Sequence, residues 1–333
     1  MSFLLPYNAI LATLDFFTDE FPTYKPEFLL PLVISYPMLA VQTMAFFILH
    51  KIPLQLRMTA TYALNALVTL LLVLVPLLLA SSHQPLAYYL VVALCVVYGA
   101  SVALLQASLY GTAGPCAALT NNMMLGNGLS GLSVNLLRIL FLLVLPNNYN
   151  ASSQIFYYLS SAFVLFCSIL SFLFIKRNMS KDEDTPTPVK ISARMHAAYA
   201  VQKINWQAAL GELITQANYM MFFPGVILQY QLSFIPDFSW FVIFVVTYAS
   251  VVYIIGSFIA GNIDIIPKKL YLLVAVMRAA LFTTTYILTY KNVAPEFFKS
   301  DAFVLINLGL FGMSYGFVAT LGMKFGSDAT TGD

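Results

Sequence analysis

Three short polar or helix-breaking sequences interrupt segments of this chain that are apolar and long enough to cross a lipid bilayer. They are Leu4-Leu5-Pro6-Tyr7-Asn8, Gly126-Asn127-Gly128-Leu129-Ser130-Gly131 and Arg278-Ala279-Ala280-Leu281-Phe282. Hydrocarbon offers no water to polar groups, so proline, glycine clusters and arginine persist there only where they face protein or a watery cavity. The pattern predicts a helical membrane protein with a polar interior, which is typical of transporters.

The composition supports the same class of protein. Of the 333 residues, 60% are hydrophobic and 9% are charged, whereas a soluble domain is about 25% charged. The net charge of +2 argues against nucleic-acid binding. The spacing of Cys95, Cys116 and Cys167 fits neither zinc nor a disulfide framework. Because no nucleophile–base pair, metal cluster or phosphate loop stands out, we expect no enzyme activity, no metal and no cofactor.

The apolar segments predict about ten transmembrane helices. A span needs about 20 apolar residues, and residues 2–17 are too few for a complete one. We therefore expect the first helix to be incomplete or unusually short. The nine full spans are predicted near residues 29–49, 58–80, 86–110, 120–145, 154–175, 206–230, 238–262, 269–290 and 302–323.

The distribution of lysine and arginine predicts the orientation. With a cytoplasmic N-terminus, 11 of the 16 lysines and arginines fall on inner loops, 3 on outer loops and 2, Arg138 and Arg278, within spans. This distribution follows the positive-inside rule. The sequon Asn150-Ala151-Ser152 then lies on an outer loop, where Asn150 is a candidate glycosylation site.

The hydrophilic stretch 176–204 predicts a division of the chain into two helical bundles. It contains Lys181-Asp182-Glu183-Asp184 and two prolines, a composition typical of a flexible cytoplasmic linker. We expect an N-terminal six-helix bundle over residues 1–175, a linker over 176–204 and a four-helix bundle over 205–325. Residues 326–333 would form a short tail.

Several polar residues inside the predicted spans are candidate site residues. Gly128, Gly131, Asn135 and Arg138 share one helix face, and Arg138 either contacts substrate or holds the bundle together through a buried partner. Gln106 suits an uncharged polar ligand or an interhelical hydrogen bond. Two further groups follow in sequence: Glu212, a candidate for proton coupling or for snorkelling to the surface, and Gly312 with Gly316, whose spacing favours close helix packing.

Five of these sequences resemble the equilibrative nucleoside transporters in order along the chain. The family's Leu-Pro-Trp-Asn is similar to Leu5-Pro6-Tyr7-Asn8, and its fourth-helix Leu-Gln-Gly-Ser run to Leu105-Gln106-Ala107-Ser108. The remaining matches are the fifth-helix glycine run Gly126–Gly131 followed by Arg138, the ninth-helix Arg278, and the tenth-helix sequence Ser314-Tyr315-Gly316-Phe317.

The resemblance implies an eleven-helix, major-facilitator-like fold with a central site used by alternating access. It implies transport of nucleosides or nucleobases across the plasma membrane or an intracellular membrane, passively or with protons. By position, Tyr7, Leu11 and Gln106 would line the site, with Arg138 and Arg278 in or near it. We expect ten of these eleven helices in this sequence, without a counterpart of the eleventh.

One family motif differs in this chain. The eighth-helix Asp-x-x-Gly-Arg, which contacts ribose, aligns with Tyr253-Ile254-Ile255-Gly256-Ser257. A tyrosine offers one hydroxyl in place of a carboxylate, so Tyr253 and Ser257 favour a nucleobase over a nucleoside. A carrier for another small organic solute, or a non-transporting membrane scaffold, is the alternative.

Overall fold

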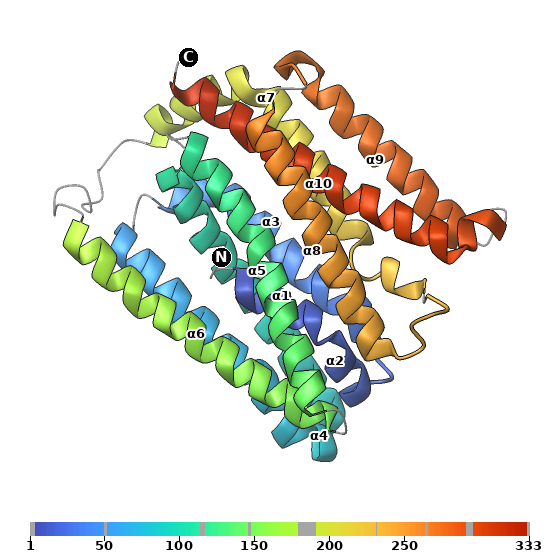
Figure 1. The fold of residues 1–333 in the computed structure, drawn as a ribbon. Coiled ribbons are helices and arrows are strands. Elements are labelled where there is room, and N and C mark those ends of the chain that lie inside the picture. The colour runs from blue at the N-terminus through green and yellow to red at the C-terminus, as the bar shows by residue number, and fades with distance from the viewer. Residues whose placement is uncertain are drawn as a thin grey trace. The chain divides into compact units, whose positions relative to one another are not determined.

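A computed structural model describes residues 4–49, 52–113, 117–145, 148–178, 191–230, 232–263, 266–290 and 296–331, and within them the regular secondary structure is helical (Figure 1). The helices of the first part are α1 (Leu5–Ala12), α2 (Leu14–Glu20), α3 (Pro26–Ile48), α4 (Leu54–Ala113), α5 (Ala117–Val144) and α6 (Tyr149–Asn178). The second part holds α7 (Ile191–Phe222), η3 (Ile227–Gln229), α8 (Phe238–Asn262), α9 (Lys268–Tyr290), η4 (Glu296–Lys299) and α10 (Asp301–Thr331).

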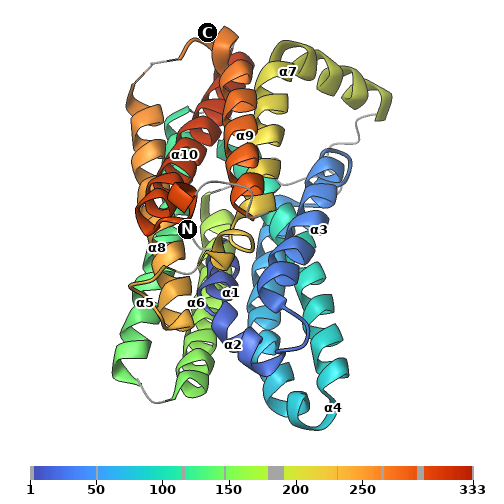
Figure 2. The same cartoon turned by 90° about the vertical axis from the view of Figure 1, so that its right-hand side faces the viewer.

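Seven helices among the described residues are long and apolar enough to cross a membrane. One of them, α4, covers two predicted spans, because His83 has a non-helical backbone that kinks the helix between them. Figure 2 shows α4 doubling back at this point. The prediction of an all-α, polytopic membrane protein is therefore confirmed.

Two predicted spans take a different form in the structure. In place of one helix over residues 2–17, α1 and α2 are separated at Thr13, whose φ of −126° and ψ of 28° are not helical. The span expected over 206–230 is α-helical only to Phe222, and the short 3-10 helix η3 follows it. It stops there because Pro224 has no N–H to donate and its ring would clash with the preceding turn.

The chain forms two compact units. The N-terminal unit comprises residues 1–112 and 133–191, and the C-terminal unit comprises residues 113–132 and 192–333, so α5 contributes to both. The predicted linker 176–204 includes the end of α6 and the start of α7, and residues 179–190 lie outside the described residues. The six-plus-four division of the helices stays a prediction.

In the N-terminal unit, one core joins the helix break near Thr13 to α3, α4 and α6. Its fully buried members include Phe17, Ile34, Tyr98 and Tyr157. The backbones of α3 and α4 come so close that a Cβ at Gly99 would overlap the carbonyl oxygen of Ile34. Close backbone approach of this kind replaces the hydrophobic driving force that lipid does not supply between helices.

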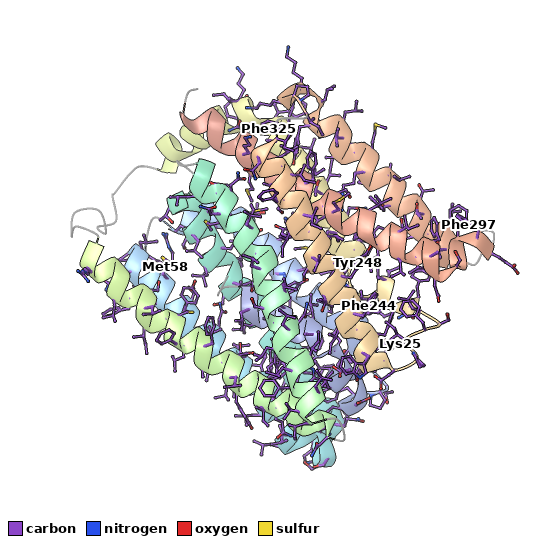
Figure 3. All side chains as sticks on the ribbon, in the orientation of Figure 1. Lys25, Met58, Phe244, Tyr248, Phe297 and Phe325 are labelled. Carbon is purple, nitrogen blue, oxygen red and sulfur yellow. The ribbon has the colours of Figure 1, made fainter. Side chains whose placement is uncertain are left out.

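In the C-terminal unit, α8 packs closely against α10 (Figure 1). A Cβ at Gly256 would overlap the carbonyl oxygen of Met313, and one at Gly316 would overlap that of Tyr253. Only glycine permits this approach. Figure 3 shows Phe244 and Tyr248 following one another along α8, with Phe297 and Phe325 near opposite ends of α10.

The ends of α8 follow local sequence signals. Asp237 is its N-cap, and its side chain accepts a hydrogen bond from the backbone N–H of Trp240 at 3.1 Å. The helix then runs for 25 residues with apolar side chains on all sides, as expected where one face meets protein and the other meets lipid. Besides pairing with α8, α10 contributes Phe311, Ser314 and Tyr315 to the polar cluster described next.

Candidate functional site

The C-terminal unit buries Arg278 on α9 within a set of neutral hydrogen-bond acceptors. Its side chain is 5% exposed. The guanidinium donates from Nε to Ser314 Oγ at 2.9 Å, from Nη1 to Asn218 Oδ1 at 3.2 Å and from Nη2 to the carbonyl oxygen of Phe311 at 3.1 Å. These three bonds satisfy the planar fork of the arginine without a carboxylate in contact, so Arg278 keeps its positive charge within the unit.

Aromatic rings surround this guanidinium. Its carbon lies 5.0 Å from the ring centre of Phe311, 5.5 Å from Phe282 and 5.7 Å from Tyr315, within the range of cation–π attraction. Tyr315 in turn stacks on Tyr219, with ring centres 3.8 Å apart and planes at 9°. The cluster therefore combines a fixed cation with a stack of planar rings.

A chain of polar side chains extends from this stack along α7. The hydroxyl of Tyr315 donates to Gln216 Oε1 at 2.8 Å, and Gln216 Nε2 donates to Glu212 Oε1 at 2.9 Å. Glu212 Oε2 lies 3.5 Å from the hydroxyl of Tyr271. The sequence suggests Glu212 and the polar tenth span as conceivable partners of Arg278, and the structure places Glu212, Ser314 and Arg278 in one network.

The two eighth-helix candidates, Tyr253 and Ser257, lie beside this network on α8. The hydroxyl of Tyr253 is 3.5 Å from the carbonyl oxygen of Met124, and its ring lies against Gly128 of α5. Ser257 is buried and donates to the carbonyl oxygen of Gly316 at 3.2 Å. Both hydroxyls thus face backbone carbonyl oxygens of neighbouring helices.

In the N-terminal unit, Arg138 on α5 is fully buried and pairs with a residue that the sequence reasoning missed. Its Nη2 lies 2.9 Å from Asp15 Oδ2, and its Nη1 donates to Ser152 Oγ at 2.9 Å. Asp15 could have been found, because a carboxylate within an apolar segment is rare without a buried partner.

The ion pair lies next to the break between α1 and α2. Thr13 at the break donates its hydroxyl to the carbonyl oxygen of Ala9 and also lies 2.8 Å from the hydroxyl of Tyr157 on α6. Asp15 Oδ1, Arg138 Nε and both polar atoms of the Asn135 amide are buried without a hydrogen-bond partner among the described residues. This region therefore carries polar groups beyond those that the ion pair uses.

Three other predicted site residues also belong to the N-terminal unit. Gln106 on α4 accepts a hydrogen bond from Gln42 Nε2 on α3 at 2.8 Å. Tyr7 is half-buried and its hydroxyl is hydrogen-bonded to Ser35. Leu11 is buried. The structure therefore places Tyr7, Leu11, Gln106 and Arg138 in one unit, and Arg278, Tyr253 and Ser257 in the other.

The remaining candidates have positions that favour packing or surface roles. Gly128 faces Tyr253 and Ile254, and Gly312 faces Val252. Gly126 is half-buried and Gly131 is buried, both on α5. Asn150 is exposed in the first turn of α6, and its amide lies 3.5 Å from Glu20 Oε1. Ser152 of the same sequon is the buried acceptor for Arg138. Among the described residues, no group of His, Cys, Asp and Glu is arranged to hold a metal ion.

Comparison with known proteins identifies a similar transporter. No protein-family model matches this chain. Over 176 residues, 52% of its length, the chain is 32% identical to Equilibrative nucleoside transporter 4 of Homo sapiens. The matched part covers 33% of that protein, so this chain spans about a third of the length of the curated relative it matches. The match confirms the resemblance to equilibrative nucleoside transporters that the motifs predicted.

Proposed function

We propose that this integral membrane protein is a carrier that moves nucleosides or nucleobases across the bilayer by alternating access, and not an enzyme. The observation that carries the proposal is the Arg278 cluster. It sets a cation and the stacked rings of Tyr219 and Tyr315 side by side on three helices. Stacking rings and hydrogen-bonding side chains are the groups that recognise planar heterocycles. Similarity to a protein named as a nucleoside transporter supports the same substrate class.

We further propose that the substrate is recognised mainly by its base. A carboxylate can accept from two ribose hydroxyls, whereas Tyr253 and Ser257 each have one hydroxyl. Both of those hydroxyls are already directed at the carbonyl oxygens of Met124 and Gly316. A ribose hydroxyl could therefore bond to Tyr253 or Ser257 only by replacing an interhelical hydrogen bond. This exchange reduces the extra binding energy that a nucleoside would have over a free base.

In the N-terminal unit, we propose Gln106 as a substrate-binding residue. Its carbonyl oxygen already accepts from Gln42, so its amide nitrogen is oriented by that bond and could donate to a ring nitrogen or carbonyl of a base. Tyr7 and Leu11 stay candidates for the same site. The plasma membrane is the proposed location, by analogy with the family.

Uptake of radiolabelled adenine, hypoxanthine, adenosine and uridine tests the proposal, in cells lacking their own purine and pyrimidine carriers. Surface expression is measured in parallel. We expect saturable uptake with adenine or hypoxanthine preferred. Arg278→Gln should lower uptake by at least tenfold at equal surface expression, because it removes the charge and two of the three donated bonds.

The matched control is Leu281→Ala on the same helix, which changes a side chain that is 64% exposed and should leave uptake unchanged. Saturable uptake of a different organic solute, with purines failing to compete, would contradict the substrate class. Absence of uptake of all four compounds at normal surface expression would contradict transport of nucleosides or nucleobases.

A further inference from the structure

We propose that Glu212 is a proton-binding site and that Gln216 transmits its protonation state to the aromatic stack through Tyr315. The coupling of this proton to transport rests on the proposed function, whereas the proton site and the relay do not. The proposal starts from the unbroken series of hydrogen bonds from Tyr271 through Glu212 and Gln216 to Tyr315.

The orientation of the Gln216 amide matches an ionised Glu212. A carboxylate only accepts hydrogen bonds, and an amide has one accepting oxygen and one donating nitrogen. With Glu212 ionised, Gln216 must therefore turn Nε2 toward it, as observed at 2.9 Å. The amide oxygen then faces Tyr315, whose hydroxyl donates to it at 2.8 Å.

Protonation of Glu212 on Oε1, the oxygen that faces Gln216, reverses the bonds from Glu212 through Gln216 to Tyr315. The proton forms an O–H bond on Oε1, which then becomes a donor toward Gln216, while Oε2 still accepts from Tyr271. For Gln216 to accept, its amide must rotate by about 180°, which brings Nε2 to face Tyr315. Tyr315 must then accept instead of donate, and its own O–H has to turn toward another acceptor. One proton at Glu212 thus changes the hydrogen bonding of a ring in the stack.

The charged and titratable groups around Glu212 come from two neighbouring helices. From α9, Tyr271 donates to the carboxylate and Arg278 is close enough to interact with it electrostatically. From α10, Tyr315 is linked through Gln216, and the backbone of Gly322 approaches the carboxylate closely. Lys268 of α9 is held elsewhere, by Asn205 Oδ1 at 3.3 Å and the carbonyl oxygen of Phe325 at 3.5 Å.

The position of Arg278 gives the proton a second effect. Glu212 interacts electrostatically with Arg278, so neutralising Glu212 removes this attraction from the guanidinium. Tyr315 lies 5.7 Å from that guanidinium and stacks on Tyr219 at 3.8 Å. Proton binding therefore changes both the field and the hydrogen bonding at the rings proposed to contact substrate.

Infrared difference spectroscopy of the purified full chain in lipid nanodiscs tests the relay without any substrate. Spectra are recorded across a pH series, following the C=O band of protonated carboxylic acids and the ring modes of tyrosine. For the wild type, we expect a carboxylic-acid band and a tyrosine shift that titrate with the same midpoint. Glu212→Gln should lose the part of the carboxylic-acid band that titrates with the tyrosine shift, and the tyrosine shift itself, because it fixes a neutral side chain at this position.

Two variants of Gln216 separate the proton site from the relay. Gln216→Leu and Gln216→Asn should keep the carboxylic-acid band but lose the linked tyrosine shift, with helical circular dichroism confirming that each variant folds. Glu296→Gln, which replaces an exposed carboxylate of the same unit, is the matched control and should keep both signals. A tyrosine shift that survives in the Gln216 variants, or bands unchanged in Glu212→Gln, would overturn the proposal.

Transport data then separate this proposal from the proposed function. If the wild type takes up purine but shows no tyrosine shift linked to the carboxylic-acid band, the carrier proposal is supported and the relay is refuted. If the linked tyrosine shift is present but purine uptake is absent, the relay is supported and the substrate proposal is refuted.

Discussion

The buried ion pair between Asp15 and Arg138 offers the sharpest test of how the N-terminal unit is held together. Both side chains are almost completely buried, and their charged atoms are 2.9 Å apart. Asp15→Asn would leave a buried arginine without its compensating charge. Breaking such a pair from one side typically costs about 3–5 kcal/mol.

The remaining contacts of Arg138 determine how much of this stability Asp15→Asn should lose. The bond from Nη1 to Ser152 would persist, and an asparagine at position 15 could still accept from Nη2. The uncompensated charge is therefore the main loss, and we expect Asp15→Asn to cost about 3 kcal/mol. Asp15→Leu combined with Arg138→Met removes both charges, so the double variant should be more stable than either single variant.

A double-mutant cycle measures this coupling. The free energy of unfolding is obtained from helical circular dichroism in mixed micelles with increasing fractions of a denaturing detergent. The single variants of the cycle are Asp15→Leu and Arg138→Met. We expect each of them to lower the free energy of unfolding more than the double variant does, with a coupling energy of about 2–3 kcal/mol. Asp19→Asn, which changes an exposed carboxylate on the same helix as Asp15, is the control and should stay within about 0.5 kcal/mol of the wild type. Additive single losses, or an Asp15→Asn variant as stable as the wild type, would refute the argument.

Two further predictions concern helix packing and capping in the C-terminal unit. Gly316→Ala should destabilise the protein by about 1–3 kcal/mol in the same assay, because the new Cβ would overlap the Tyr253 carbonyl oxygen. Gly111→Ala is the control, because a Cβ there would meet open space. An equal loss of stability in both variants would contradict the packing argument. Asp237→Ala should lower the free energy of unfolding by about 1 kcal/mol through loss of the hydrogen bond from the Trp240 N–H. Asp237→Ser should retain most of that stability, because serine is also a good N-cap. Equal losses in the two variants would exclude capping as the cause.

The sequence alone determined the class of fold and the identity of the buried arginines. Long apolar segments leave the backbone of a membrane protein only helical structure, so ranges such as 238–262 and 269–290 predicted α8 and α9 closely. A charge within such a segment must have partners, and this requirement alone marked Arg138 and Arg278 as interior residues. The motif order also predicted the transporter resemblance that the comparison confirmed.

The sequence suggested Glu212 and the tenth span as partners of Arg278 and none for Arg138, and only the tertiary structure decided which contacts these charges make. Asp15 and Arg138 are 123 residues apart, and Arg278 draws its acceptors from α7 and α10. Sequence periodicity places a residue on a face of its own helix but does not specify which helix packs against that face. The same limit hid the link from Glu212 to Tyr315, because Gln216 joins them only when α7 and α10 pack together. Packing between distant helices, and not any local signal, therefore assigned Arg138 to an ion pair and Arg278 to an aromatic cluster.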